Sequence, residues 1–255
     1  MKELKLNLFA PVDKIPNIVD YSYETEVYND DSYRILVQGV RLTQIHRDIL
    51  DIALNCGSSE LEQMTDTTVP VRTFSLYMVL SKLNHKNKRN FKWLRTKFTE
   101  LKRANIVVYD KKEKETYEFN IIRISKHSDK LNTFVIVLEE LYMALFEKEI
   151  SVDYKALLPE ILKLKHPQTK AIIRYLLTHT KGHQINIDKL MSKVGIGFNG
   201  NKRNFEIYRS KILKELEDIK DIFNLELIKM SNDKRKKSDY TIKYKRHEDI
   251  KIYYP

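Results

Sequence analysis

The chain has 255 residues, with 46 Lys and Arg against 35 Asp and Glu, so its formal net charge is +11 and its pI is about 9.4. Its single cysteine, Cys56, excludes an internal disulfide and a zinc site built on several cysteines, and no apolar run reaches the roughly 18 residues of a membrane-spanning helix. We therefore expect a cytoplasmic protein without a signal peptide at Met1–Ala10, and its positive charge favours a polyanionic partner.

The first 57 residues predict an arm, a strand and a helix. Residues 1–30 show little periodicity and become acidic and rich in tyrosine, so we expect an N-terminal arm with partial order at best. Tyr33–Val40 predicts a short strand, and Leu42–Leu54 has apolar residues at helical spacing and predicts a helix that ends at Gly57. Ser58–Thr68 is polar and predicts a loop.

A basic pentapeptide follows and recurs later in the chain. Asn-Lys-Arg-Asn-Phe stands at Asn87–Phe91 and again at Asn201–Phe205, so the offset is 114 residues (201 − 87). In both copies, three residues separate the Phe from Arg-Thr-Lys or Arg-Ser-Lys, at Arg95–Lys97 and Arg209–Lys211. Such a repeat indicates two copies of one structural unit.

The surroundings of the two copies follow one order. A short amphipathic run precedes each copy, and within these runs Leu80–Leu83 is echoed by Met191–Val194. After each copy come an amphipathic helix, a β-like run, a charged turn and a second strand. The predicted strands and turns are 106–109, 110–115 and 117–124 in the first half, and 225–230, 231–238 and 240–244 in the second.

Helix, helix, strand, charged turn, strand is the order of a winged helix-turn-helix. We therefore predict an α+β, helix-rich fold with two tandem winged helix-turn-helix domains related by internal duplication. After the arm, residues 31–146 are expected to form domain 1, suited to dimerisation and DNA contact, and residues 147–255 to form domain 2, the main DNA-binding domain. Thr133–Leu138 adds a strand to domain 1, and Thr169–Thr180 matches the opening helix of domain 2.

The helix after each pentapeptide is predicted to bury one face and expose a cationic one. With steps of 100° per residue from Phe205, one side of the helix collects Tyr208, Ile212, Leu216 and Ile219. The opposite side collects Arg203, Ile207, Ser210, Lys211 and Lys214. In the first copy the residues opposite Phe91 are Arg89, Trp93, Thr96 and Lys97.

Cations, hydroxyls and one apolar side chain suit the major groove of DNA, because Arg and Lys reach guanine acceptors or phosphates and an apolar group contacts thymine methyls. A solvated charged face is the alternative for either helix. For Arg95 and Arg209, which lie at the edge of the apolar face, the alternative is a packing role. The predicted DNA-binding residues are Lys88, Arg89, Arg95, Lys97, Lys202, Arg203, Arg209, Lys211 and Lys214, with Lys234, Arg235, Lys236 and Lys237 in the second wing.

Three further patterns predict no chemistry. Gly195–Gly200 matches the dinucleotide fingerprint, but a helix precedes it where the fingerprint needs a buried strand, so we expect a turn between helices. His179 and His183 stand four apart without an acidic partner, so no metal is expected. No nucleophile–base set or carboxylate pair stands out, and we expect neither an enzyme nor a cofactor.

Two stretches of this chain resemble the plasmid replication initiators that bind iterons, the tandem winged-helix Rep proteins. In the second half, Leu164–Lys170 leads into Tyr175–Leu177, and Phe205–Ile219 is similar to the basic helix of that family. In the first half, Tyr33–Asp48, with Gly39-Val40-Arg41-Leu42-Thr43-Gln44, looks like the opening of initiators from broad-host-range plasmids. The resemblance covers roughly residues 33–245.

The resemblance implies an initiator that binds direct repeats at a plasmid origin with both winged helices on one face of double-stranded DNA. It also implies recruitment of host replication proteins, and repression of the initiator's own gene by homodimers formed through domain 1. Alternatives are a winged-helix transcriptional regulator that binds a promoter palindrome, and a scaffold adaptor that uses its winged helices for protein contacts. An enzyme that uses the glycine loop would be stabilised by nucleotide.

The two predicted wings differ in charge, which generates a first prediction. Lys234–Lys237 is an uninterrupted cationic run, whereas Lys111–Glu115 nearly neutralises itself. Because counterion release scales with the phosphates neutralised, replacing Lys234–Lys237 by alanine should flatten the dependence of log affinity for DNA on log salt. An unchanged slope would show that this wing does not meet the backbone.

Overall fold

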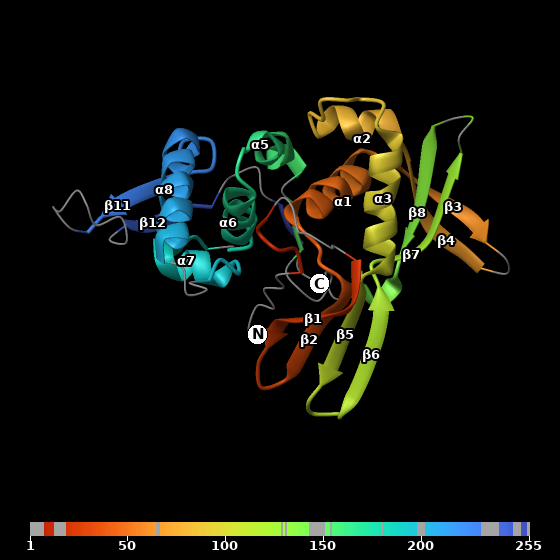
Figure 1. Ribbon diagram of the computed structural model, residues 1–255, viewed down its shortest axis with the longest axis horizontal. Coiled ribbons are helices and arrows are strands. Elements are labelled where there is room, and N and C mark those ends of the chain that lie inside the picture. The colour runs from red at the N-terminus through yellow and green to blue at the C-terminus, as the bar shows by residue number, and fades with distance from the viewer. Residues whose placement is uncertain are drawn as a thin grey trace. The chain divides into compact units, whose positions relative to one another are not determined.

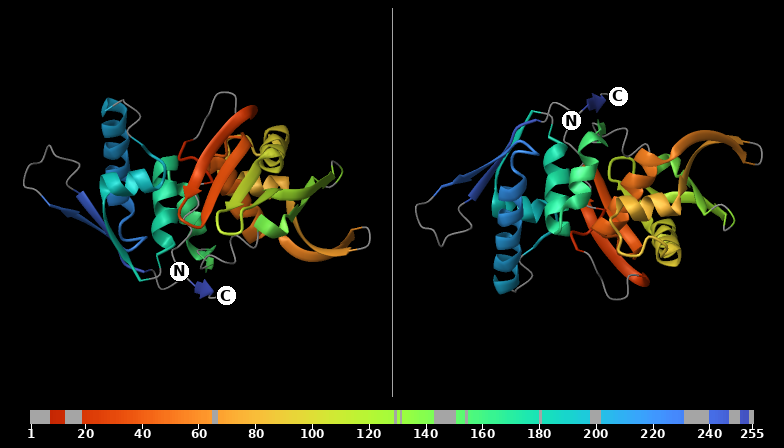
Figure 2. Two further views of the ribbon diagram at one scale, coloured as in Figure 1. Left: turned by 90° about the horizontal axis from the view of Figure 1, so that it is seen from below. Right: turned by 90° about the horizontal axis from the view of Figure 1, so that it is seen from above.

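The computed structural model describes residues 8–12, 19–64, 67–128, 130, 132–142, 151–153, 155–179, 181–197, 202–230, 240–246 and 251–253. The chain divides into unit 1 (residues 1–9 and 14–149) and unit 2 (residues 10–13 and 150–255). Both units combine helices with antiparallel sheets, so the predicted α+β, helix-rich class is confirmed (Figures 1 and 2). None of the described helices is long and apolar enough to cross a membrane.

Unit 1 contains two four-stranded antiparallel sheets. In each sheet, alternate side chains of the strands face the helices; Ile35, Val37 and Ile106, for example, are almost fully buried. The first sheet has the order β1 (Val19–Asn29), β2 (Tyr33–Val40), β5 (Asn105–Asp110), β6 (Glu115–Asn120), and the second the order β3 (Ser58–Met64), β4 (Thr67–Ser75), β8 (Thr133–Leu138), β7 (Ile122–Ser128).

Two predictions for unit 1 are wrong. Val19–Asn29, expected within an arm, is the edge strand β1 and pairs with β2. Its tyrosine, threonine and valine residues alternate with polar ones, a strand period that the acidic composition concealed. Ser58–Thr68 was expected to be a loop, but Ser58–Met64 is β3 and Thr67 and Thr68 begin β4, and the pairing of these strands satisfies the backbone of this polar segment.

Three helices cover the sheets of unit 1: α1 (Gln44–Cys56), α2 (Leu76–Lys82) and α3 (Phe91–Arg103). At the start of α3, the Asn90 side chain accepts a hydrogen bond from the backbone N–H of Trp93, which is the geometry of an N-cap. Lys102 and Arg103 lie in its last turn, where cations interact favourably with the helix dipole. Phe98 of α3 packs between Phe74 and Phe134, with ring centroids 5.2 and 4.7 Å away.

A buried polar network joins α1 to α3. The backbone N–H of Thr43 donates to Nδ1 of His46 at 3.0 Å, so Nε2 carries the proton of the neutral ring and donates to Oε2 of Glu100 at 2.6 Å. Lys97 Nζ donates to the same oxygen at 2.7 Å. Burial, together with the nearby Lys97 charge, lowers the pKa of His46 despite the neighbouring carboxylate. Burial alone would raise the pKa of Glu100, but the bonds from His46 and Lys97 leave it lowered.

Unit 2 has the element order that the sequence predicts for a winged helix, with a three-stranded sheet of order β10-β12-β11. Its elements are β9 (Ser151–Asp153), η1 (Lys155–Leu157), α5 (Leu158–Lys163), α6 (Pro167–Leu177), β10 (His183–Asn186), α7 (Ile187–Lys193), α8 (Lys202–Ile219), β11 (Leu225–Lys229), β12 (Tyr240–Tyr244) and β13 (Lys251–Tyr253), the last paired with β9.

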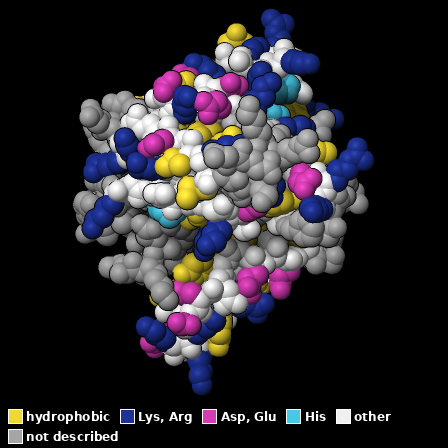
Figure 3. All heavy atoms as spheres, turned by 90° about the vertical axis from the view of Figure 1, so that its left-hand side faces the viewer, with side chains coloured by type: hydrophobic (Ala, Val, Ile, Leu, Met, Phe, Trp, Pro, Cys, Tyr) yellow, Lys and Arg dark blue, Asp and Glu magenta, His cyan; other side chains and the backbone are white. Residues whose placement is uncertain are grey.

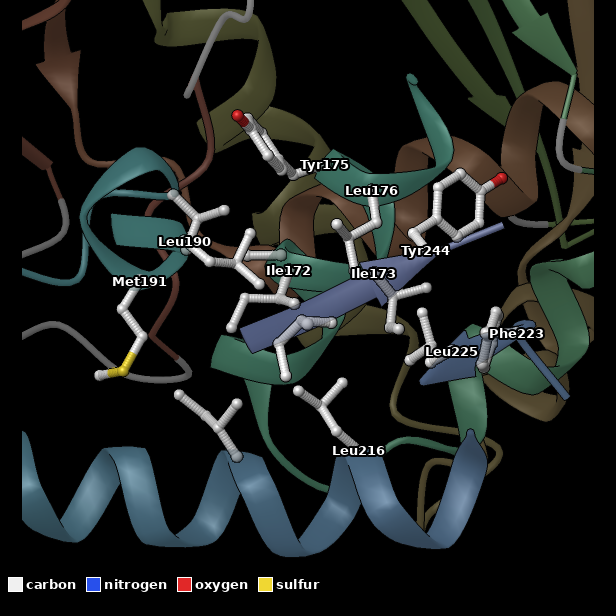
Figure 4. Close-up of a cluster of buried hydrophobic side chains, with 14 of the residues drawn as sticks. Ile172, Ile173, Tyr175, Leu176, Leu190, Met191, Leu216, Phe223, Leu225 and Tyr244 are labelled. Carbon is white, nitrogen blue, oxygen red and sulfur yellow. The ribbon is translucent and has the colours of Figure 1, made fainter. Parts of the chain in front are cut away.

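One hydrophobic core holds unit 2 together (Figure 4). Leu176 of α6, Met191 of α7, Leu216 of α8 and Tyr244 of β12 point into it and are each at most 2% exposed. Burying each of the leucine and methionine side chains contributes about 1.5–3 kcal/mol relative to exposure. The core therefore fixes the face that α8 turns inward.

The network around His46 generates a prediction for unit 1. The pKa of His46 is below 6.5 in the folded chain and near 6.5 in the unfolded one. Between these two values only the unfolded chain binds the proton, so His46 gives full stability above pH 6.5 and reduces it as pH falls below that value. Thermal unfolding from pH 8 to 5 should show this decline in the native chain and less of it in His46→Gln. His127→Gln, which alters an exposed histidine, is the matched control. Equal slopes in the native chain and His46→Gln would contradict the assignment.

Candidate nucleic-acid interface

The helix α8 buries one arc and exposes the other. Its buried residues are Phe205, Ile212, Leu213 and Leu216. Tyr208, which was expected in the apolar face, is 38% exposed, and Leu213, which was not expected there, is 8% exposed. The buried arc is therefore rotated from Tyr208 toward Leu213, because the core of α6 and α7 contacts that side.

The exposed arc of α8 has a stripe of one residue per turn. Its members are Arg203, Ile207, Ser210 and Lys214, spaced by four, three and four residues. Ile207 is 41% exposed, and the Ser210 hydroxyl donates to the carbonyl of Glu206 at 2.8 Å. We call these four residues the α8 stripe. Lys202 and Lys211 lie exposed beside it.

The cations at the α8 stripe are available to a ligand. Arg203, Lys211 and Lys214 form no ion pair with the described part of the chain. Figure 3 shows one face of the molecule, where Lys and Arg side chains are interspersed with Asp and Glu. Positively charged side chains of the described residues thus form no continuous patch on that face. Whether a given Lys or Arg can bind a ligand depends on whether it is paired with a neighbouring carboxylate.

Arg209 is not free, and its prediction as a DNA contact is corrected. Its Nε and Nη2 donate to the two carboxylate oxygens of Asp188 at 2.6 and 2.8 Å, and its guanidinium lies 5.1 Å from the ring centroid of Phe205. The side chain is 12% exposed. A bidentate pair of this kind joins α7 to α8 and matches the packing alternative.

Two of the four predicted contacts in unit 1 have structural roles too. Lys88 Nζ lies 3.5 Å from the carbonyl oxygens of Leu80 and Ser81 at the end of α2, where a cation is favoured. Lys97, expected to point outward, is 14% exposed and bonded to Glu100. Arg89 is exposed and Arg95 half-buried.

The two pentapeptides do not occupy equivalent positions. Asn87–Asn90 forms the turn before α3, with the Asn87 side chain accepting from the N–H of Arg89, whereas Lys202–Phe205 is the first turn of α8. The helices themselves start 111 residues apart. The first helix of each pair starts at Leu76 (α2) and Ile187 (α7), which gives 187 − 76 = 111, and the second starts at Phe91 (α3) and Lys202 (α8), which gives 202 − 91 = 111. The structural offset is therefore 111 and not 114.

Burial confirms the offset of 111. At this offset, Leu76, Val79 and Leu80 of α2 correspond to Ile187, Leu190 and Met191 of α7. Likewise, Leu94 and Leu101 of α3 correspond to Phe205 and Ile212 of α8. All ten residues are buried. A difference of three residues turns a helix face by about 60°. The predicted outward face of α3 was rotated by that amount, so sequence reasoning found the exposed Thr96 but missed the exposed Lys92, Thr99 and Arg103. The sequence contained one indication of the correct offset: Leu80–Leu83 is similar to Met191–Val194, and these segments are 111 residues apart (191 − 80).

Other predicted features are placed as follows. Lys234, Arg235, Lys236 and Lys237 lie outside the described residues. Gly195, at φ 83°, stands after α7 as a turn glycine. His179 and His183 stack with ring centroids 3.9 Å apart, and within the described ranges no group of three or more His, Cys, Asp or Glu could hold a metal.

An open groove of about 540 Å³ lies beside α8. Lys211 and Lys214 line it together with Lys165 and His166 of the α5–α6 connection. Glu215 accepts hydrogen bonds from the backbone N–H groups of Lys165 and His166 at 2.6 and 3.3 Å. These two bonds hold the α5–α6 connection against α8. The groove therefore lies where two elements of unit 2 pack together.

Comparison with known proteins gives likeness in structure and none in sequence. No family model matches the chain, and no curated protein matches it. A selenomethionine structure of domains 2 and 3 of RctB is similar with a TM-score of 0.62 and 14% identity, over 96% of each chain. Another structure of RctB domains 2–3 gives 0.58 and 12%, over 93% of this chain and 94% of that one.

The Pi initiator protein in complex with iteron DNA is similar with a TM-score of 0.52 and 16% identity, over 81% of this chain and 92% of that one. The resemblance to replication initiators is thus confirmed at the level of the fold, and it extends along both units of the chain.

The Asp188–Arg209 pair generates a prediction for unit 2. Asp188→Asn and Arg209→Met, which keeps most of the stem, should each lower the free energy of unfolding by about 1–2 kcal/mol, because each leaves a half-buried charge with a poorer partner. Since both act on one interaction, the double variant should be destabilised by less than the sum of the two. Urea unfolding measures this, and strictly additive effects would contradict the role as a link between helices.

Proposed function

We propose that this chain is a non-enzymatic, sequence-specific double-stranded DNA-binding protein that initiates plasmid replication by binding repeats, or iterons, at the origin. The observation that carries the proposal is the α8 stripe, which presents two unpaired cations, an exposed isoleucine and a serine from a rigidly packed helix. The likeness to the Pi initiator protein, which is in complex with iteron DNA, supports it.

The chemistry of the α8 stripe suits a major groove. Arg203 can donate two hydrogen bonds to N7 and O6 of guanine, and Ile207 can contact a thymine methyl group. Lys202, Lys211 and Lys214 can neutralise phosphates on either side and so hold the helix in register. No cofactor enters this scheme.

Replication initiation adds partners to DNA binding. We expect an initiator to meet host replication proteins at the origin, and homodimers formed through unit 1 to repress the initiator's own gene in the cytoplasm. The alternative is a winged-helix transcriptional regulator that binds a promoter operator. Footprinting separates the two, because an initiator should protect direct repeats and a regulator an inverted repeat.

The α8 stripe generates a test of binding. Arg203→Ala with Lys214→Ala should weaken binding to a duplex selected from a random-sequence library by about tenfold or more, and should reduce the salt slope by about one for each phosphate that is no longer neutralised. Lys181→Ala with Lys245→Ala, two exposed cations of unit 2 outside α8, is the matched control for net charge. Equal weakening in the two double variants would argue against specific contact by α8.

Initiation itself is tested in cells. The gene with its adjacent DNA should maintain a plasmid that has no other origin, and the Arg203→Ala, Lys214→Ala variant should fail to do so. Failure of maintenance by the native gene, with tight promoter binding retained, would favour the regulator.

A further inference from the structure

The exposed side of α3 in unit 1 carries four residues, of which the repeated sequence motif contains only Thr96. They are Lys92, Thr96, Thr99 and Arg103, which we call the α3 stripe, and all four are exposed. We propose that unit 1 meets double-stranded DNA through the α3 stripe, and that Asn87, Lys88 and Asn90 of the pentapeptide before α3 support the two helices without reading the DNA. This inference rests on the proposed function of the α8 stripe.

The first argument is positional. At the offset of 111, each residue of the α3 stripe corresponds to one of the α8 stripe: Lys92 to Arg203, Thr96 to Ile207, Thr99 to Ser210 and Arg103 to Lys214. Both stripes begin and end with a cation and have a methyl-bearing side chain followed by a hydroxyl. The residues from Arg72 to Arg103 and from His183 to Lys214 also share a strand end and two helices.

The second argument is charge. Glu100 is the one acidic residue of α3, and it is 5% exposed and bonded to His46 and Lys97. The exposed charges of α3 are therefore all positive. Lys92 and Arg103 form no ion pair with the described residues, so both remain available to phosphates.

The third argument is the state of the two threonines. The hydroxyl of Thr96 donates to the carbonyl of Lys92 at 3.1 Å, and that of Thr99 donates to the carbonyl of Arg95 at 3.0 Å. Because these bonds occupy the hydroxyl protons inside the helix, the methyl groups and the acceptor lone pairs of the hydroxyl oxygens are left for contact. Threonine methyl groups suit the thymine methyl in a major groove.

Two of the predicted contacts, Lys88 and Lys97, are already engaged, and so is Asn90 of the pentapeptide, whereas Arg89 is exposed. Lys88 caps α2, Asn90 caps α3 and Lys97 is bonded to Glu100. Moving any of these side chains onto DNA would leave a helix end or a buried carboxylate without its partner. The α3 stripe can bind without that cost.

The test compares three double variants of the full chain on the duplex selected by the native protein. Lys92→Ala with Arg103→Ala removes the cations of the α3 stripe, and should weaken binding about tenfold or more and reduce the salt slope by about two. Arg123→Ala with Lys126→Ala removes two exposed cations from β7 and should change both quantities much less. Thermal unfolding should be unaltered in both, since all four side chains are exposed.

Arg203→Ala with Lys214→Ala on α8 completes the comparison. Weakened binding in the α8 variant with native binding in the α3 variant would overturn this inference and leave the proposed function intact. Native binding in both would overturn both. Equal weakening by the α3 and β7 variants would overturn the inference as well, because it would reflect net charge alone.

Discussion

The packing of α8 against α6 and α7 determines which of its side chains can reach a partner. Phe205, Ile212 and Leu216 enter the core of unit 2, and their burial fixes the rotation of the helix about its axis. Because a helix turns by 100° per residue, a core that held a different arc would expose a different set of cations. Arg203 and Lys214 are presented together since both lie opposite that core.

Arg209 shows how packing also removes a cation from the functional surface. In unit 1 the equivalent position holds Phe98, which packs between two other phenylalanines. In unit 2 the position holds an arginine that stacks on Phe205 and pairs with Asp188, so the charge is neutralised at the edge of the core. The helix pair gains a directional link at this point, and the exposed charge of α8 is carried by residues without such a partner.

Much of the fold was predictable because hydrophobic periodicity and turn residues specify it locally. The strands Tyr33–Val40 and Thr133–Leu138 and the helix order of unit 2 were all found from the sequence. The rotation of α3 was not, because its face was judged from Phe91, whereas Leu94, Phe98 and Leu101 are the buried residues. Glu100 is buried with them and is bonded to His46, which lies 54 positions away in the chain. The strand β1 was missed since its pairing partner and not its composition makes it a strand.

The repeated pentapeptide misled for a physical reason. Asparagine is favoured in turns and at helix N-caps, and lysine at helix C-termini, so any helix–turn–helix tends to collect these residues between its helices. In unit 1 Asn87, Lys88 and Asn90 satisfy backbone groups in this way. Recurrence of polar residues therefore indicates a shared ligand only where their side chains have no backbone or ion-pair partner. In the described part of this chain Arg203, Lys211 and Lys214 on α8 meet that condition, and so do Arg89, Lys92 and Arg103 in unit 1, whereas Asn87, Lys88 and Asn90 do not.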